Sequence, residues 1–464
     1  MQPFKLLITS IAFFSSTMLS AQTLQENLDA VIDQMLPYAN VGIYIKDIQS
    51  NKVVYQRNAN KLFNPASNMK LLSAAAALYE LGPNYRYTTN LAKQGDDIYF
   101  NFNGSPSLTT EKLQNLVLQL PKLGINKINN VILDASHFKP PFYAPGTSYD
   151  DLGWYYAAPS TAIILNENAI AYDVSAKELN KIAEITSQAV DNPLTVINEV
   201  ITVSKADEKE HCSFNIQTLK NNTLRLYGCI AQTKQPKKMF FAIPNPMLFA
   251  KQIIEQTLVK NGIELKGRVT PGRTPASAQI LAKEESANLI VLLAHMLEES
   301  DNLYADSITK QLAVNLTGEG TYKQGAYSIK TSLSKHTHLN MKQIELADGV
   351  GTRYNLITPE QLVVLLTDLY HDEALGPLFL GALPKMGQSG TLKERMKKSP
   401  LMGKIAAKTG SMHDVSALSG YMVAPNGKEY VFSIISNGIN TNIVKAKELE
   451  EKILLTVALE NKVD

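Results

Sequence analysis

A serine and a lysine lie three residues apart at the start of a long apolar stretch. Ser67 and Lys70 belong to the segment NPASNMKLLSAAAAL, residues 64–78, which is apolar on nearly every side and therefore typical of a buried helix. Residues three apart share one face of a helix, so the two side chains would project together. Burial disfavours the charged form of lysine, and a neutral amine can accept a serine proton. The spacing predicts a nucleophilic serine with its own base.

The position of the serine strengthens this interpretation, although the pattern alone is weak. Ser67 follows Pro65 and should lie near the helix N-terminus, where free backbone N–H groups and the helix dipole favour developing negative charge. The pattern Ser-x-x-Lys nevertheless occurs four times, beginning at Ser67, Ser136, Ser307 and Ser332. A capping serine followed by a surface lysine would produce the same letters. Further motifs are needed to choose among the four.

Two later motifs supply the missing specificity. Ser300-Asp301-Asn302 lies in ESDNLYAD, at the expected junction of two helices, and Lys408-Thr409-Gly410 lies in AAKTGSM, on an expected strand. The order of the three motifs on a helix start, a loop and a strand is far more specific than any one of them. Rival chemistries lack support, because no histidine is followed by glutamate and no Gly-x-Ser-x-Gly or glycine-rich phosphate loop occurs.

The elements around these motifs suggest one domain interrupted by a long insertion. Residues 24–36 read as an amphipathic helix, and the alternation that follows reads as a hairpin. From about residue 283 helices dominate, and the end of the chain reads as successive strands closed by a helix over 442–460. Between about 88 and 280 the pattern changes to a small α/β unit and then to β-rich sequence. The helix and hairpin near the start of the chain therefore have elements to pack against near its end.

The three motifs in this order resemble those of the low-molecular-mass class C penicillin-binding proteins, the D-alanyl-D-alanine carboxypeptidase/endopeptidase family of penicillin-binding protein 4 type. The resemblance covers almost the whole chain after the first 21 residues. The segments that carry it are NPASNMK, YYAAPSTAIILNEN, ESDNLYAD, DGVGTRYNLITPEQL, LPKMGQSGTLKERM and AAKTGSMHDVSALSGY.

The resemblance implies an α+β fold: a serine β-lactamase/D,D-peptidase (transpeptidase-like) domain with two smaller inserted domains. The D,D-peptidase domain would comprise 22–88 and 281–464. A β-rich inserted domain would comprise 89–102 and 167–280, and a nested α/β domain would comprise 103–166. This nesting follows mainly from the family.

The resemblance also implies a role for each residue of the first two motifs. Ser67 would be the acylated nucleophile, with Lys70 as its proton acceptor. Ser300 would pass a proton to the leaving amine, and Asn302 would bind the substrate backbone.

The third motif would hold the end of the substrate. Lys408 and Thr409 would bind the terminal carboxylate of D-Ala, and Gly410 would let the substrate strand lie close to the backbone. The backbone N–H groups of Ser67 and Ser411 would form the oxyanion hole. A carboxylate substrate needs a cation, which the lysine would supply.

Other residues near the motifs leave alternatives open. Arg353 would contact the acidic stem residue of the substrate or form a structural ion pair with Asp348 or another acid. Asp150 or Asp151 would either reach the site from the insert or lie in a solvated turn, and the turn is favoured. His413, just after the third motif, reads as an exposed strand-end histidine.

The N-terminal sequence predicts export, and the composition argues against a nucleic-acid partner. Hydrophobic residues make up 45% of the 464-residue chain, and the net charge of +2 gives no electrostatic reason to expect a nucleic-acid partner. Residues 1–21 read as a signal peptide, and cleavage after Ala21 is favoured over retention as a membrane anchor. This predicts export to the periplasm, with peripheral membrane association left open. Cys212 and Cys229 would then form a disulfide, or else remain two buried thiols.

The expected activity is that of a serine-type D-Ala-D-Ala carboxypeptidase, with D,D-endopeptidase activity as a second outcome. Its expected partners are peptidoglycan stem peptides and β-lactam antibiotics, and no metal or organic cofactor is implied. Two alternatives remain: a non-catalytic muropeptide-binding protein and a serine β-lactamase or esterase on the same scaffold. The sequence leaves the oligomeric state undetermined.

Overall fold

Both ends of the chain build one antiparallel sheet. The computed structural model describes residues 23–460, so the predicted signal peptide over 1–21 lies outside the described residues. The sheet has five strands in the order β16-β17-β18-β1-β2. Their bounds are Asn40–Asp47 for β1, Val53–Arg57 for β2, Ile405–Met412 for β16, Val415–Val423 for β17 and Glu429–Asn437 for β18. β1 pairs along its whole length with residues 430–437 of β18, which joins the two chain ends.

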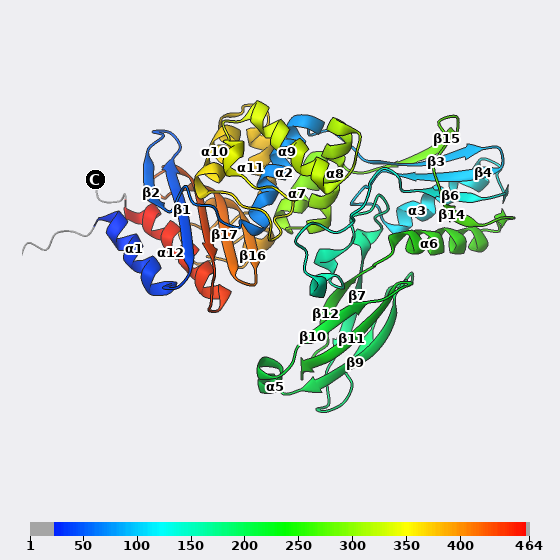
Figure 1. Ribbon diagram of the computed structural model, residues 1–464, viewed down its shortest axis with the longest axis horizontal. Helices are drawn as coiled ribbons and strands as arrows, with labels where there is room; N and C mark the ends of the chain where they lie inside the picture. The colour runs from blue at the N-terminus through cyan, green and yellow to red at the C-terminus, as the bar shows by residue number, and fades with distance from the viewer. Residues whose placement is uncertain (1–22, 461–464) are drawn as a thin grey trace, which may run out of the picture.

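Each face of this sheet contributes to a separate hydrophobic core. Along β18, Ile434 packs into one core and Ile435 into the other, as the two-residue period of a strand requires. Helices α1 (Leu24–Met35) and α12 (Ile443–Glu460) cover the first face. A group of helices covers the second face: α2 (Lys70–Leu81), α7 (Leu289–Glu298), α8 (Asn302–Thr317), α9 (Tyr322–His336), α10 (Pro359–His371) and α11 (Gly376–Ala382). This arrangement confirms the predicted α+β class (Figure 1).

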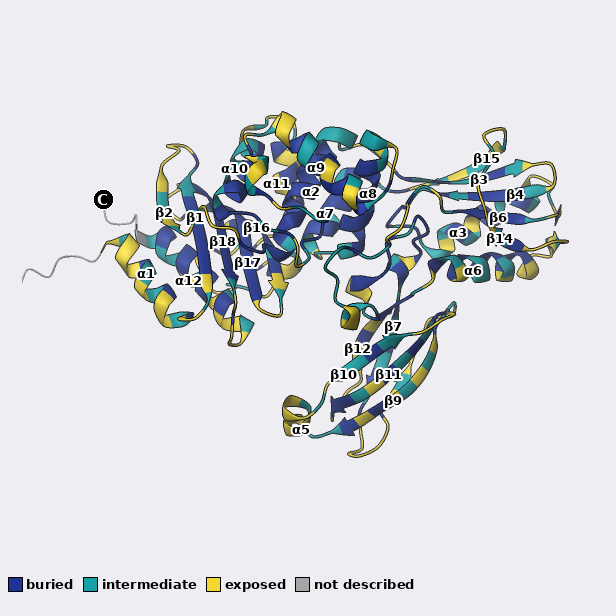
Figure 2. Cartoon of the chain, viewed as in Figure 1, coloured by how far each residue is buried: buried dark blue, intermediate teal, exposed yellow. Residues whose placement is uncertain are grey.

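Helix α2 lies at the centre of the helical layer. Its residues from Lys70 to Leu78 are all buried, which explains why the sequence is apolar on nearly every side. It packs against α7, α8 and α9. Figure 2 shows this dark, buried centre beside the sheet.

The insertion begins with an α/β domain. Its five-stranded sheet has the order β14-β6-β4-β3-β15 and mixes parallel and antiparallel pairs. The strands are β3 (Thr88–Gln94), β4 (Asp97–Phe102), β6 (Val131–Asp134), β14 (Val269–Pro271) and β15 (Gln279–Glu285). Helices α3 (Thr110–Val117) and α6 (Pro246–Lys260) pack together beside it, with α4 (Gln119–Lys122) following α3. A short pair joins β5 (Lys127–Ile128) to β13 (Glu264–Leu265).

A β-rich domain is nested inside the α/β domain. Two three-stranded sheets form it, with the orders β10-β11-β9 and β12-β7-β8. The elements are β7 (Ala169–Ser175), β8 (Glu184–Thr186), β9 (Thr195–Val203), α5 (Lys205–Glu210), β10 (Phe214–Thr218), β11 (Thr223–Ala231) and β12 (Lys237–Ala242). A disulfide between Cys212 and Cys229 ties the segment before β10 to β11.

Strand pairing divides the insertion differently from the predicted boundaries. β4 and β6 pair in parallel, although the boundary predicted between residues 102 and 103 separates them. β3 likewise pairs with β15, so 88–102 and 269–285 belong to the α/β domain rather than to the β-rich one. The nesting is therefore reversed from the prediction. Alternation identifies a half-buried strand but carries no information about its partner, which here is more than 170 residues away.

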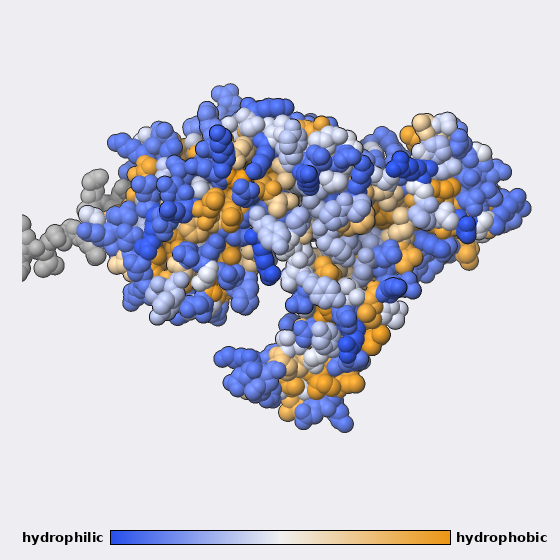
Figure 3. All heavy atoms as spheres, viewed as in Figure 1, coloured by the Kyte–Doolittle hydropathy of each residue, from blue (hydrophilic) through white to orange (hydrophobic). Residues whose placement is uncertain are grey.

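The three parts are arranged around one junction. In Figure 1 the domain with the two chain ends lies at the left, the α/β domain at the right and the β-rich domain below. Figure 3 shows hydrophobic residues gathered on the β-rich lobe among hydrophilic ones. Within residues 23–460, no helix combines the length and apolar character needed to cross a membrane.

Candidate active site

Ser67 and Lys70 meet where a short helix leads into α2. Ser67 lies in the 3-10 helix η1 (Ala66–Met69), and Lys70 is the first residue of α2. The Lys70 Nζ atom donates hydrogen bonds to Ser67 Oγ and to Asn302 Oδ1, each over 2.8 Å. The lysine is completely buried. The contact predicted from the three-residue spacing is therefore present, and the second motif reaches it.

The surroundings of Lys70 lower the pKa of its amine. Burial is the largest influence and lowers the pKa of Lys70 to about 8, while the negative charges of Asp301, Asp306 and Asp348 partly oppose this shift. At neutral pH a useful fraction of this amine is therefore uncharged. An uncharged amine in hydrogen-bond contact with a serine hydroxyl can act as its base.

The turn that carries Ser67 is held by backbone contacts on two sides. Ala66 has a φ of 45°, a strained value for a residue with a side chain. A Cβ atom at Gly410 would lie 2.6 Å from the carbonyl oxygen of Pro65, so only glycine lets β16 approach this closely. Gly351 approaches the other side, where a Cβ atom would overlap the Ala66 carbonyl group. These contacts fix the direction of the Ser67 side chain.

A second lysine lies beside the first. Lys408 is also completely buried, and its Nζ atom donates hydrogen bonds to Ser300 Oγ and to the carbonyl oxygen of Thr409, each over 2.9 Å. Burial, followed by the charge of Lys70, lowers the pKa of Lys408 well below its ordinary value. Ser300 has a φ of 59°, which turns the chain sharply between α7 and α8. The structure thus brings Ser300 into contact with the third motif.

Helix α8 positions Asn302 through its cap. Asp301 is the N-cap residue, and its Oδ1 atom accepts a hydrogen bond from the backbone N–H of Tyr304 over 3.0 Å. Asn302 Nδ2 donates a hydrogen bond to the carbonyl oxygen of Tyr156 over 2.7 Å. The amide of Asn302 is therefore held between Lys70 and the insert. The role of Tyr156 could not be predicted from the residue types, because every residue has a backbone carbonyl.

Strand β16 carries the third motif on the edge of the sheet. β17 pairs with one edge of β16, and residues 384–386 hydrogen-bond to the other edge at Ile405 and Ala407. The part of that edge from Lys408 onward can therefore pair with an extended peptide. Thr409 Oγ1 donates to Thr391 Oγ1 over 2.8 Å, and Ser411 is exposed farther along the strand. This geometry fits a substrate backbone that lies along β16 beside Ser67.

A cavity of about 510 Å³ opens above these groups. Its walls include residues of the first two motifs, of β16 and of the insert: Ser67, Ser300, Asn302, Ser411, Tyr155 and Tyr156. Asp151 and His413 also line it, and Arg353 lies exposed at its wall. Lys70 and Lys408 lie buried behind this surface. A peptide of a few residues would thus meet a hydroxyl nucleophile, amide groups and one cationic side chain.

The two alternatives for Arg353, a contact with the substrate or a structural ion pair, differ in whether the side chain has an acidic partner. Asp348 accepts hydrogen bonds within its own loop, from the backbone N–H groups of Val350 over 2.9 Å and Gly351 over 2.8 Å, and from Asn355 Nδ2 over 2.9 Å. Over residues 23–460, no ion pair joins Arg353 to Asp348 or to any other acid. Its guanidinium group is consequently available to a ligand in the cavity.

Asp151 differs from the favoured prediction, which placed it in a solvated turn away from the site. Asp151 lines the cavity and accepts a hydrogen bond from the Tyr156 hydroxyl over 3.0 Å, whereas Asp150 is an exposed residue of the turn. His413 is exposed just beyond β16, as expected, and it too lines the cavity. Asp151 therefore has a place at the site that a solvated turn alone would not give it.

A second Ser-x-x-Lys pair, Ser307 and Lys310, makes contacts of a different kind. Ser307 Oγ donates to the carbonyl oxygen of Gly104 over 2.5 Å. Lys310 Nζ donates to the carbonyl oxygens of Pro141 over 2.9 Å and Ser160 over 2.8 Å. Both side chains bind the backbone of the insert and join it to α8, so this pair is structural.

The chain resembles solved and curated proteins over most of its length. It is 30% identical over 431 residues to the D-alanyl-D-alanine carboxypeptidase DacB of Haemophilus influenzae, covering 90% of this chain and 89% of that protein. It is 28% identical to the D-alanyl-D-alanine carboxypeptidase of Actinomadura sp. strain R39, covering 94% of this chain and 85% of that one. A crystal structure of penicillin-binding protein 4 from Haemophilus influenzae superposes with a TM-score of 0.85 at 28% identity, covering 92% and 98% of the two chains.

The sheet between two helical layers, with a serine–lysine pair at the start of the central helix, is the plan of the serine β-lactamase and penicillin-binding fold. The chain belongs to the D-Ala-D-Ala carboxypeptidase 3 (S13) family, whose sequence model matches residues 24–458. A further solved relative, penicillin-binding protein 4 of Haemophilus influenzae complexed with a novel β-lactam, superposes with a TM-score of 0.80 at 27% identity, covering 93% of this chain and 99% of that one.

Proposed function

We propose that this protein is a serine-type D-Ala-D-Ala carboxypeptidase that acts on peptidoglycan stem peptides through an acyl-enzyme on Ser67. One observation carries the proposal: the Ser67 hydroxyl lies 2.8 Å from a buried amine with a lowered pKa and faces a cavity. The activity that names the family and the curated relatives supports the same reaction.

Acylation begins when Ser67 Oγ attacks the carbonyl carbon of the penultimate D-Ala. Lys70 Nζ takes the hydroxyl proton as the new C–O bond forms. The backbone N–H groups of Ser67 and Ser411 stabilise the negative oxygen of the tetrahedral intermediate. Asn302 orients Lys70 through the 2.8 Å contact with its Oδ1 atom and binds the peptide backbone of the substrate.

Release of D-Ala, followed by release of the shortened peptide, completes the cycle. The C–N bond of the intermediate breaks, and Ser300 passes a proton to the leaving nitrogen, assisted by its 2.9 Å contact with Lys408. Water then attacks the Ser67 ester and restores the hydroxyl group. The shortened peptide leaves as a carboxylic acid. A β-lactam would acylate the same serine, because opening its amide leaves the nitrogen attached to the acyl group, where it blocks water.

Strand β16 and the cavity wall would hold the substrate. Thr409 would contact the terminal carboxylate, with the buried Lys408 behind it acting through its hydrogen bond to Ser300. The close approach of Gly410 to Pro65 would bring β16, and the peptide along it, beside Ser67. Arg353, which has no acidic partner over residues 23–460, contacts the acidic stem residue. The same site would cleave the bond between D-Ala and diaminopimelate in a cross-link, which gives D,D-endopeptidase activity.

The location of the protein is also part of this proposal. Residues 1–21 would direct export, and peptidoglycan is present only outside the inner membrane. The disulfide between Cys212 and Cys229 supports an oxidising compartment such as the periplasm. Fractionation of cells should recover the processed chain with periplasmic markers, and recovery of unprocessed chain in the cytoplasm would contradict export.

Digestion of purified peptidoglycan tests the activity directly. Mass spectrometry of the products should show stem peptides that have lost one D-Ala, and cleavage of cross-linked dimers if the endopeptidase reaction also occurs. Ser67→Ala should abolish both. A protein that binds the fragments but leaves every mass unchanged would instead be a non-catalytic binding protein. Rapid turnover of penicillin without a lasting adduct would point to a β-lactamase.

A further inference from the structure

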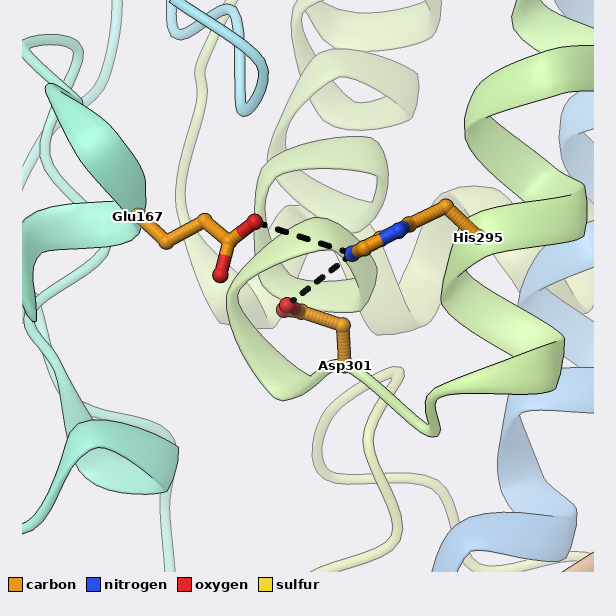
Figure 4. Close-up of side chains that lie close together, drawn as sticks. All are labelled: Glu167, His295 and Asp301. Atoms are coloured by element: carbon orange, nitrogen blue, oxygen red, sulfur yellow. Dashed lines mark ion pairs between the residues drawn. The ribbon is translucent and has the colours of Figure 1, made fainter. Parts of the chain in front are cut away.

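A group of metal-ligating side chains lies beside the candidate active site. Among residues 23–460, Glu167, His295 and Asp301 place one ligand atom each within 4.8 Å of one another. His295 Nε2 lies 3.5 Å from Asp301 Oδ2 and 3.7 Å from Glu167 Oε1 (Figure 4). The three residues come from α7, from the N-cap of α8 and from the short helix η4 of the insert.

The distances fit a shared cation better than direct hydrogen bonds. Hydrogen bonds between an imidazolium and a carboxylate are about 2.7–2.9 Å long, shorter than both distances here. His295 Nε2 is shielded from water and has no hydrogen-bond partner in the described residues. In a tetrahedral zinc site, bonds of about 2.1 Å place neighbouring ligand atoms about 3.4 Å apart. The spacing around His295 is close to that value.

The surrounding structure holds the Asp301 carboxylate in place and fixes the backbone beside Glu167. Asp301 commits its Oδ1 atom to the backbone N–H of Tyr304, which leaves Oδ2 directed at His295. Glu167 lies in η4, next to the completely buried Asn168, whose side chain accepts a hydrogen bond from the backbone N–H of Leu165 over 3.0 Å. A hydrogen bond to a ligating carboxylate, such as the one that Asp301 accepts, orients the ligands of metal sites.

Charge around the group also favours a cation. The three side chains line a cavity of about 290 Å³ together with Glu299, Tyr155 and Phe240. Among the described residues that line this cavity there are three carboxylates and no lysine or arginine. The cavity leaves space for a water molecule to complete a fourth coordination position.

We propose that Glu167, His295 and Asp301 bind a divalent transition-metal ion, with Zn²⁺ as the best match to one imidazole and two carboxylates. Asp301 lies between Ser300 and Asn302, so the ion would fasten the loop of the second motif to the insert. The proposed role of the ion is to position this loop, and no step of the proposed reaction passes through it. The proposal does not depend on the peptidase activity.

Zinc binding by the exported chain without an affinity tag tests the proposal. After treatment with a chelator and exchange into metal-free buffer, calorimetry should show one Zn²⁺ bound per chain. Glu167→Gln and His295→Phe should each weaken binding at least about tenfold, because even loss of an outer-shell partner commonly has that effect. His295→Phe keeps a ring against Tyr304, whose ring centroid lies 4.3 Å from that of His295.

A histidine in a similar setting provides the matched control. His336 stacks on Tyr79 with ring centroids 4.5 Å apart, and its Nε2 atom lies 3.9 Å from the single carboxylate of Glu80. His336→Phe should therefore leave zinc affinity unchanged. Mg²⁺ should not compete, because it prefers octahedral oxygen coordination.

A second measurement reports on the loop itself. Zn²⁺ should slow amide hydrogen exchange at residues 299–303 in the wild type and not in Glu167→Gln. The proposal is overturned if the folded wild type binds no zinc, or if His295→Phe and Glu167→Gln bind it as tightly as the wild type. Penicillin labelling of the same samples shows separately whether the peptidase site is intact, so the two proposals can fail independently.

Discussion

Acylation of Ser67 should become faster as the pH rises, because Lys70 accepts the serine proton only when it is neutral. With the pKa of Lys70 lowered to about 8 by burial, the neutral fraction is about a tenth near pH 7 and about nine-tenths near pH 9. The acylation rate constant should therefore increase about tenfold over this range and then level off. A lysine with an ordinary pKa would instead give a rate that keeps rising steeply throughout.

Stopped-flow measurement with a fluorescent penicillin would provide the rate constant at each pH. Saturating concentrations are essential, because they separate the acylation rate constant from any change in penicillin affinity with pH. Circular dichroism at each pH would show that the protein stays folded, and Ser67→Ala would provide the background signal.

Two results would refute this reasoning. A saturated rate that is the same near pH 7 and near pH 9 would mean that the proton does not pass to Lys70. An inflection near the ordinary lysine pKa of 10.5 would mean that the buried amine is not perturbed as the structure indicates. Lys70→Arg keeps a cation at the position but cannot become neutral, so it should remain unacylated across the range.

Replacing Lys70 with Met should abolish acylation and raise the free energy of unfolding, measured by chemical denaturation near pH 7, by about 2 kcal/mol. The lowered pKa of Lys70 destabilises the folded wild type by about 3 kcal/mol below that pKa, and the hydrogen bonds of Lys70 offset part of this cost. The wild type gains stability as the pH rises from about 8 toward the unfolded-state value, since the unfolded chain then binds more protons, so the advantage of Met should disappear there. Gly410→Ala should slow acylation at least about tenfold, because its Cβ atom would displace the turn that carries the nucleophile. Gly381→Ala, where an added Cβ meets nothing within 4 Å, should leave the acylation rate unchanged. Replacing Cys212 and Cys229 with Ser should destabilise the β-rich domain by about 3 kcal/mol in denaturation experiments and leave the acylation rate unaltered, because the 17-residue loop closed by the disulfide does not line the site.

Short-range features of the site could be predicted because helix geometry determines them. Ser67 and Lys70 are three residues apart at the start of a helix, and this alone brings their side chains together. The contacts of Lys70 with Asn302 and of Lys408 with Ser300 span 232 and 108 residues. No local pattern predicts such contacts, and only the family resemblance placed these residues at one site.

The division of the insertion could not be predicted for the same reason. β3 and β15 pair across the whole insertion, and neither strand carries a mark of its partner. The contribution of Tyr156 was hidden because its carbonyl group is common to all residues. Glu167 and His295 lie far apart in the sequence and match no metal-binding spacing, so the group they form with Asp301 emerges only from the fold.

The covalent state of Ser67 is the central claim, and mass spectrometry tests it most directly. After incubation with penicillin, the mature chain should gain the mass of one penicillin, and proteolytic fragments should locate that mass on Ser67. Ser67→Ala should gain no mass while remaining folded by circular dichroism. A folded wild type that gains no mass, or an adduct that persists in Ser67→Ala, would contradict the account.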